Sequence, residues 1–334
     1  MPAAMARLFD RVLDLLALIG RFGTQGLAAS IFVGLALPWL AAAARPVLPV
    51  CILCFIVLTI ARADEGRLRA AIRRPGPLAA AVAWLVVAPA AATSAIIALI
   101  GRDGLDPGFL LGLALIGAAP PIMSGPAVAA LIGIEPTLIL GATLTATFLS
   151  PLTAPVIADA VAGAAVPLDG GALALRLAVF LGLGTALALA WRRIVGPARI
   201  RARGRAIDGA GVVLYGLFAI AAMDGVPAAV IATPGRVATC LGLVFAVSGL
   251  ATAASFIALR FLAPADRLVF GYGAGQRNLG MLVAALGAAV PDSTFLFFAL
   301  AQFPIYFVPS LVRAFAPAPA MPDARAAPIV SPPA

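Results

Sequence analysis

Long runs of apolar residues dominate this sequence and decide what it can fold into. Water-soluble helices alternate between apolar and polar faces, whereas these runs carry almost no polar residue, and a membrane-spanning helix needs about 20 such residues. We therefore expect an all-α polytopic membrane protein with about ten transmembrane helices. The ten runs lie at 27–44, 47–61, 78–101, 107–133, 136–163, 172–191, 209–223, 235–262, 268–289 and 293–315.

Charged residues are scarce, and the basic ones are all arginines. Only 11% of the 334 residues are charged and 63% are hydrophobic, whereas about a quarter of an average soluble domain is charged. The net charge of +9 does not indicate nucleic acid, because most of the arginines cluster in short connections between apolar runs. The expected environment is the lipid bilayer, and we expect no nucleic-acid partner.

The arginines are distributed unequally between alternate connections. With ten spans, 18 arginines fall on one side of the membrane and four on the other (Arg45, Arg102, Arg176 and Arg236), while Arg277 falls inside a span. Short cytoplasmic loops hold the excess of positive residues. The split predicts a multi-pass protein of the cell (inner) membrane with both termini cytoplasmic.

The chain divides near Pro167 into two halves with five spans each, at 25–163 and 171–315. An odd number of spans per half gives the halves opposite orientations, so the sequence predicts two inverted five-helix repeats. Before them, residues 1–24 mix apolar and charged side chains as an interfacial helix does. After them, residues 316–334 are rich in Pro and Ala without periodicity, which predicts a disordered tail.

The fourth span of each half, helices four and nine of the chain, is interrupted by helix-breaking residues. The first interruption is AAPPIMSGP at 118–126, and the second is GYGAGQRNLG at 271–280. Three prolines remove backbone donors, and four glycines permit unwinding. Unwound backbone at membrane depth is tolerated only where it is buried in protein or lines a wet cavity. Paired broken helices are typical of secondary transporters, whose solute sites lie where such helices meet.

Arg277 lies within the second interruption, where a charge costs about 2.5–3.5 kcal/mol to insert. The acids that might pair with it, Asp103, Asp159 and Asp292, are placed near the ends of spans. Two functional roles stay open, because its guanidinium can hold an anionic solute or stand in for a bound cation. The predicted solute-binding residues are Ser124, Gly125, Gln276, Arg277 and Asn278.

Hydroxyl side chains follow in the fifth span. Thr143 and Thr147 are spaced i, i+4 and share one helix face. Their oxygens can ligate a hard cation, or they can bond to carbonyls of their own helix. Either role stays open for these two hydroxyls. No metal site built from His or Cys is expected, because the chain has no His and its three Cys lie inside apolar runs.

The chain resembles the bile acid:sodium symporter family, within the superfamily of bile acid, arsenite and riboflavin transporters. The resemblance covers about 25–315 and rests on the ten spans and three motifs. These motifs are A-P-P-x-M-S-G-P in span four, T-L-T-A-T-F-L-S-P-L-T-A-P in span five and G-Q-R-N-L-G-M-L-V-A-A-L in span nine. The resemblance implies a core of spans three to five and eight to ten beside a panel of spans one, two, six and seven. Solute, expected to be a small organic anion, would bind in the cleft between them and be exposed to each side in turn.

The resemblance also places the family's sodium-site positions on this chain. They fall at Ser124, Gly125, Thr143, Thr147, Gly273, Gln276 and Arg277. The resemblance thus implies a cation site with side-chain oxygens from Ser124, Thr143, Thr147 and Gln276, and a sodium ion is the one cofactor considered. The family's amide is replaced by Gly125 and its key carboxylate by Gly273, so the site has lost negative charge beside Arg277. We therefore predict transport that does not depend on sodium.

Three alternatives remain beside the transporter. A sensor or receptor would use the same cleft without moving solute, and a homodimer is compatible with either function. An arsenite-type efflux carrier is expected to carry a Cys in the fourth span, and residues 120–126 contain none. An intramembrane enzyme is disfavoured, because the chain lacks His and H-E-x-x-H and because Ser124 has no evident base.

Overall fold

The computed structural model describes residues 12–16, 18, 23–163 and 169–315, which are almost entirely helical and contain no strand. Most of the predicted interfacial segment (1–24) and the whole predicted tail (316–334) lie outside the described residues. The long helices are α2 (Gly23–Ala36), α4 (Leu48–Arg62), α6 (Pro75–Ile100), α9 (Thr137–Ala162), α10 (Gly170–Val195), α12 (Gly204–Ala222), α14 (Pro234–Ala258) and α17 (Asp292–Phe315). The shorter helices are α3 (Pro38–Ala44), α5 (Glu65–Ile72), α7 (Pro107–Ala118), α8 (Gly125–Leu131), α11 (Pro197–Ala202), α13 (Val226–Ala232), α15 (Pro264–Gly275) and α16 (Leu279–Leu286), with 3-10 turns at Arg45–Val47 and Gly287–Ala289.

Six helical stretches in the described part of the chain are long and apolar enough to cross a membrane. This result confirms a helical, membrane-embedded protein. The count of ten spans and the inverted repeats stay predictions. The six stretches are Pro38–Arg62, Pro75–Ile100, Thr137–Ala162, Gly170–Val195, Gly204–Ala232 and Pro234–Ala258.

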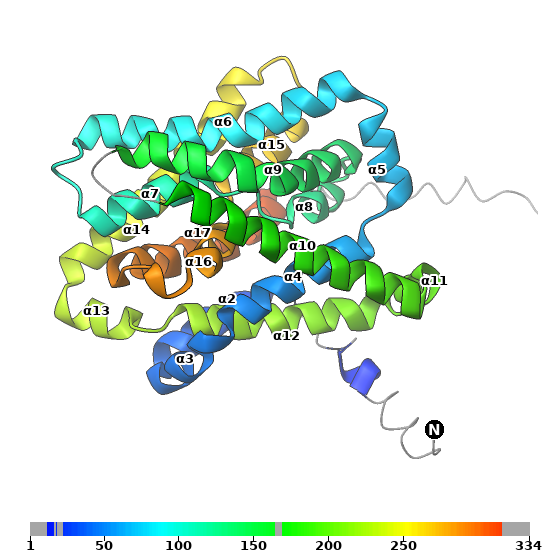
Figure 1. Cartoon of the computed structure of the whole chain (residues 1–334), viewed down its shortest axis with the longest axis horizontal. Helices are drawn as coiled ribbons and strands as arrows, with labels where there is room; N and C mark the ends of the chain where they lie inside the picture. The colour runs from blue at the N-terminus through cyan, green and yellow to red at the C-terminus, as the bar shows by residue number, and fades with distance from the viewer. Residues whose placement is uncertain (1–11, 17, 19–22, 164–168, 316–334) are drawn as a thin grey trace, which may run out of the picture.

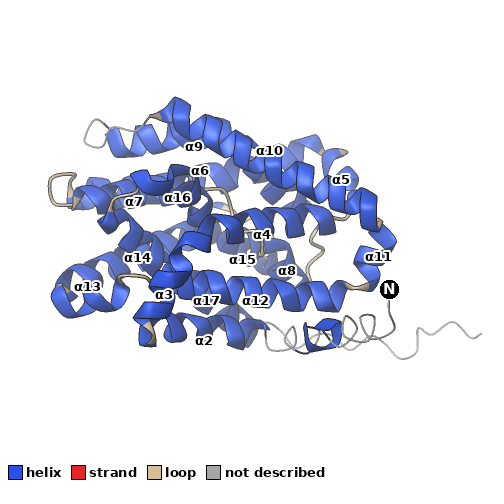
Figure 2. Ribbon diagram, turned by 60° about the horizontal axis from the view of Figure 1, so that its bottom comes forward, coloured by secondary structure: helices blue, strands red, loops and turns tan. Residues whose placement is uncertain are grey.

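Most helices run along the long axis of the molecule (Figure 1). The helices α6, α7, α8, α9, α14 and α15 lie on one side, and α2, α3, α4 and α12 lie on the other (Figures 1 and 2). Between the two groups lie α16 and α17, while α10 packs against both α4 and α9. This arrangement places the interrupted helices inside the bundle.

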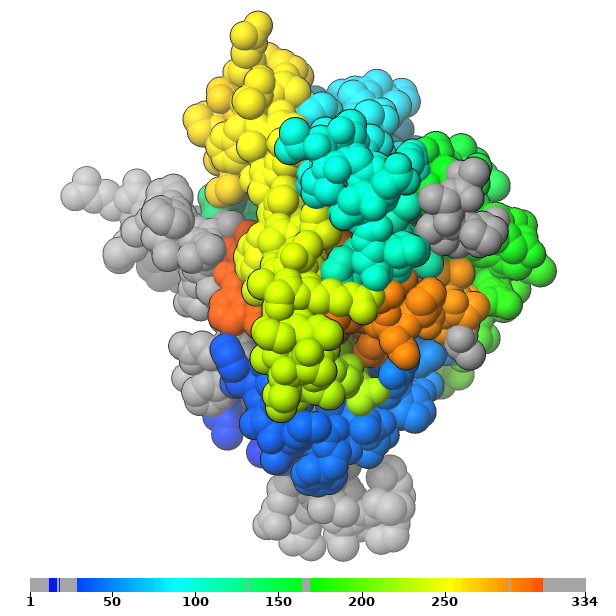
Figure 3. Space-filling model, turned by 90° about the vertical axis from the view of Figure 1, so that its left-hand side faces the viewer, coloured from blue at the N-terminus to red at the C-terminus, as the bar shows by residue number. Residues whose placement is uncertain are grey.

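The two ends of the molecule differ in charge. The helices α5 and α11, which belong to the arginine-rich connections, lie at one end, whereas α3, α13 and the connection between α6 and α7 lie at the other (Figure 1). Figure 3 looks onto this second end, where residues near 105, 230 and 285 come together. Here Arg236 pairs with Asp106, which caps the start of α7 through the backbone N–H groups of Gly108 and Phe109.

Two of the apolar runs in the sequence do not form single continuous helices with the predicted bounds. The run 27–44 is divided at Leu37 into α2 and α3, because Pro38 has no N–H and restricts the residue before it. The seventh run ends at Ala222, and α13 starts as a separate helix after Gly225. Gly225 has a φ of 75°, in the left-handed region that favours glycine.

Candidate functional site

The two interruptions form one structure, which we call the crossing (119–124 and 276–278). The helices α7 and α8 are separated by residues 119–124, and α15 and α16 by residues 276–278. The segments pair in antiparallel fashion at Pro121 and Arg277. Backbone N–H groups of Ile122 and Asn278 donate to the carbonyls of Gln276 (3.0 Å) and Pro120 (2.9 Å). Each unwound segment thus satisfies part of the other's backbone, which lipid could not do.

The glycines of the second interruption do not unwind the helix as the sequence suggested. Gly271, Gly273 and Gly275 are helical, and only 276–278 leave α15. Instead, the glycines allow close packing. A Cβ on Gly275 would lie 2.7 Å from the carbonyl oxygen of Ser248 on α14, and one on Gly273 would lie 2.8 Å from Leu85 Cδ2 on α6.

Arg277 is the largest of the fully buried side chains among the described residues, with 1% of its surface exposed. Its Nη1 donates to the Gly273 carbonyl at 3.0 Å, and its Nη2 donates to the Ala119 carbonyl. Among the described residues, no carboxylate forms an ion pair with it. Its Nε has no hydrogen-bond partner there either. Arg277 is therefore held in place by backbone oxygens and not by an acid.

The other predicted polar residues near the crossing divide into two groups. Gln276 donates from Nε2 to Ser248 Oγ (2.7 Å), and Thr147 donates to the carbonyl of Thr143 (2.8 Å). The Gln276 Oε1 and Thr143 Oγ1 atoms are buried without a partner in the described part of the chain. Thr147 thus uses its hydroxyl within α9, whereas Thr143 and Gln276 keep a free oxygen. Thr143 also lies close to Gly125, since a Cβ there would be 3.8 Å from Thr143 Oγ1.

Ser124 lies against an aromatic residue that we did not predict for the site. Its Oγ is 2.8 Å from the hydroxyl of Tyr272, and either atom can be the donor. The bond joins the start of α8 to the last turns of α15, 148 residues later in the chain. It therefore adds a side-chain link to the backbone pairing of the crossing.

A cavity of about 280 Å³ lies beside the crossing. Four of its polar lining residues belong to the crossing or to α15, and the opposite wall is formed by residues of α4 and α12. Phe55 of α4 stacks on Tyr215 of α12, with ring centroids 3.9 Å apart. The polar lining residues include Ser124, Tyr272, Arg277, Asn278 and Gln302, and the apolar ones include Ile52, Phe55, Val128, Phe218 and Ile305.

The cavity has a neighbour toward the end of the molecule that carries α3 and α13. A hollow of about 560 Å³ there includes Arg45, Asp292 and Phe295. Both spaces are lined by Ile52 and Gly280. A Cβ on Gly280 would lie 3.1 Å from Ile52 Cδ1. Gly280 therefore packs closely against Ile52, and both residues border the two spaces.

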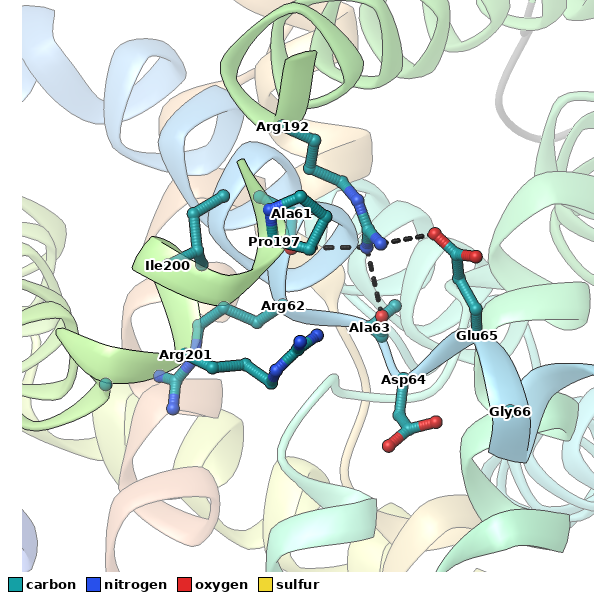
Figure 4. A pocket seen from close by; sticks show the side chains of 11 residues that line it. Ala61, Arg62, Ala63, Asp64, Glu65, Gly66, Arg192, Pro197, Ile200 and Arg201 are labelled. Atoms are coloured by element: carbon teal, nitrogen blue, oxygen red, sulfur yellow. Dashed lines mark hydrogen bonds and ion pairs between the residues drawn. The ribbon is translucent and has the colours of Figure 1, made fainter. Parts of the chain in front are cut away.

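A third space, the arginine hollow, lies at the opposite end of the molecule and has a volume of about 550 Å³ (Figure 4). Arg192 of α10 reaches across it to the carbonyls of Ala61 and Ala63 and to the carboxylate of Glu65. The backbone N–H of Arg67 holds the pKa of the nearby Asp64 carboxyl below its usual range. Arg62 of the hollow pairs with the exposed Asp208. Two arginines of the hollow, Arg62 and Arg192, are thus bound by acids and carbonyls, which indicates a structural ion-pair network. The lining residues are Ala61, Arg62, Ala63, Asp64, Glu65, Gly66, Arg192, Pro197, Ile200, Arg201 and Gly204.

The structure places the predicted residues unequally around the cavity. Ser124, Arg277 and Asn278 line it. The other predicted residues are buried and do not line it, namely Gly125, Thr143, Thr147 and Gln276. Two lining residues were not predicted from the sequence, Tyr272 and Gln302. Tyr272 lies inside the GYGAGQRN segment, and Gln302 is a buried polar residue in an otherwise apolar run, which is the signal that could have identified it.

Two further observations bear on the identity of the site. Within the described residues, no group of three or more Cys, Asp or Glu side chains could hold a metal ion. No protein-family model matches this chain, and no curated protein matches it.

Proposed function

We propose that this chain is a secondary transporter that moves a small organic anion across the membrane by alternating access. The observation that carries the proposal is the cavity of about 280 Å³ that lies between the crossing and the wall of α4 and α12. On this proposal the core comprises α6–α9 and α14–α17, and the panel comprises α2, α4, α10 and α12. The cavity then lies at the core–panel boundary, where relative movement would expose it to each side.

The charge of the cavity supports an anion as the solute. Among the described residues, Arg277 is the only charged one that lines the cavity, and no acidic one does. A buried charge that is satisfied only by carbonyl groups keeps its net positive charge, and its field is strong in a water-poor site. Asn278, Ser124 and Tyr272 add neutral hydrogen-bonding groups around it. The aromatic and aliphatic wall suits a solute with an apolar part.

The remaining features of the proposal come from the sequence. The resemblance to the bile acid:sodium symporter family supports the division into core and panel and the two inverted five-helix repeats. The arginine-rich end that carries α5 and α11 would be cytoplasmic, and both termini would then lie inside the cell. The protein is proposed to belong to the inner membrane. Transport is proposed to be independent of sodium.

The deciding experiment is uptake by purified protein in liposomes, using a panel of radiolabelled carboxylates. We expect saturable uptake of at least one anion, competition by related anions and no uptake by protein-free liposomes. Turnover of many solute molecules per protein molecule would separate a transporter from a sensor, which binds about one. The proposal fails if no anion is taken up and none raises the melting temperature of the protein.

A further inference from the structure

The surroundings of Arg277 define an unusual kind of cation site. Ala119, whose carbonyl accepts from Nη2, is the C-cap residue directly after α7. Gly273, whose carbonyl accepts from Nη1, lies in the last turn of α15. The last carbonyls of a helix have no partner within the helix. The guanidinium therefore satisfies free carbonyls at the C-terminal ends of two different helices.

The helix ends offset only part of this charge. Each helix C-terminus carries the equivalent of about half a negative charge, and the positive N-terminal ends of α8 and α16, which begin at the crossing, oppose the two C-terminal ends. The hydrogen bonds between the two interruptions, from Ile122 to Gln276 and from Asn278 to Pro120, hold both ends at one point. The crossing thus forms a cradle for one monovalent cation, and the guanidinium occupies it.

A dissolved cation does not fit the same place. A sodium ion, which the family resemblance implies, would need several oxygen ligands, and Gly125 and Gly273 supply no side-chain oxygen. Arg277 already uses the carbonyls of Ala119 and Gly273. Repulsion from the guanidinium at roughly 5 Å, with an effective dielectric constant of about 20, would weaken cation binding by a few hundredfold.

We propose that Arg277 is a tethered cation, whose guanidinium permanently fills the cradle formed by the C-terminal ends of α7 and α15, so that a dissolved monovalent cation binds there only when this side chain is removed. Two further buried oxygens in this region, Thr143 Oγ1 and Gln276 Oε1, have no partner in the described chain. The expected independence of transport from sodium rests on the proposed function. The statement that a dissolved cation binds only when Arg277 is removed does not rest on it.

The test is chemical rescue of Arg277→Ala, measured by thermal unfolding of purified protein. Guanidinium, methylguanidinium, sodium and choline chlorides are titrated over the low millimolar range at constant ionic strength. We expect guanidinium or methylguanidinium to raise the melting temperature of Arg277→Ala in a saturable manner. Choline should have no such effect, because it has no N–H donor for the carbonyls. The wild-type protein should show no saturable rise with any of the four salts.

Arg176→Ala is the matched control. Arg176 also donates to carbonyls at a helix end, those of Ala285 (3.4 Å) and Leu286 (3.2 Å) at the end of α16. Its site is open to solvent, so a dissolved cation should give no saturable stabilisation there. Equal rescue of both variants would overturn the proposal, as would a folded Arg277→Ala protein that responds to none of the small cations.

If Arg277→Ala aggregates, the same salts are added during its extraction. Recovery of monodisperse protein with guanidinium, but not with choline, supports the tethered cation, and failure with every salt overturns it. Because the readout is unfolding and not uptake, the two proposals fail separately. A protein that transports no anion can still show rescue, and an active transporter can lack it.

Discussion

Two arginines in different parts of the molecule bind helix ends in similar ways but in different surroundings. Arg192, in the arginine hollow, donates to the carbonyls of Ala61 (3.3 Å) and Ala63 (3.1 Å) at the end of α4. Arg277, at the crossing, donates to carbonyls at the ends of α7 and α15. Arg192 also pairs with Glu65, whose side chain is 57% exposed, whereas Arg277 has no carboxylate partner in the described chain.

The difference shows that an arginine bound to carbonyls at a helix end can be neutralised by an acid or can keep part of its positive charge. In the arginine hollow the positive charge is neutralised by an acid, and water screens what remains. At the crossing the charge is offset only by helix ends, and the surroundings are poor in water. The carbonyl groups hold the guanidinium in place without giving it a full counter-charge. A solute carboxylate would supply that charge, and each of the following predictions tests this contrast.

The largest effect is expected for Arg277→Ala. Anion uptake should fall by at least about 100-fold, because charge-assisted hydrogen bonds contribute about 1.5–3 kcal/mol each. The protein should still insert, since removing a charge from a span eases insertion. Arg192→Ala is the control, and its uptake per folded molecule should stay within about twofold of wild type. Normal uptake by Arg277→Ala would return this residue to a purely structural role.

A smaller effect is expected for Gly275→Ala, which tests how closely the crossing is packed. The new Cβ would lie 2.5 Å from Thr252 Oγ1 and 2.7 Å from the Ser248 carbonyl, and such overpacking costs about 1–3 kcal/mol. Gly249→Ala on α14 is the matched control, because nothing lies within 4 Å of its position. Thermal unfolding should separate the two variants. Equal melting temperatures would show that α14 and α15 are less tightly packed than described.

Glu65→Gln tests the arginine hollow. The exposed ion pair with Arg192 should contribute about 0–1 kcal/mol to stability, and this contribution should shrink as salt is added. The bonds from Arg192 to the carbonyls of α4 remain in the variant. Denaturant unfolding at low and high salt provides the measurement. If the free energy of unfolding fell by several kcal/mol and this loss did not depend on salt, the ion pair of Arg192 with Glu65 would be shielded from water, as Arg277 is.

Replacing sodium with potassium or choline should change anion uptake by less than about twofold. The reason is the positive charge that Arg277 already places at the crossing, which disfavours a second cation nearby. Uptake is measured with equal osmolarity and ionic strength on both sides of the liposome membrane. Strict dependence on sodium would show that the crossing retains a cation site despite Arg277.

The smallest effect concerns Asp64 at the edge of the arginine hollow. Its carboxylate caps α5 by accepting from the Arg67 N–H at 3.0 Å, and this bond lowers its pKa. A lowered pKa in the folded state means that the cap is complete above the ordinary value of about 3.9 and weakens as the pH falls below it. Amide exchange at Arg67 should therefore lose protection only in that acidic range. Loss of protection already near neutral pH would contradict this assignment.

The sequence alone determined the features that depend on neighbouring residues. Apolar runs require a membrane, and prolines at 120–126 end α7 because they lack N–H groups and clash with preceding carbonyls. Arg277 can likewise be identified from its neighbours in the sequence, because a charge inside an apolar run is costly. These constraints act over a turn or a span, so composition and spacing are enough to find them.

Only the tertiary structure decided what these residues contact. The partners of Arg277 at Ala119 and of Ser124 at Tyr272 lie 158 and 148 residues away along the chain, and no local pattern encodes such distances. The glycines of 271–275 illustrate the same limit, because glycine permits both unwinding and close packing. Contact with α6 and α14 selects the packed helix, and the wall of α4 and α12 turns the crossing into a cavity.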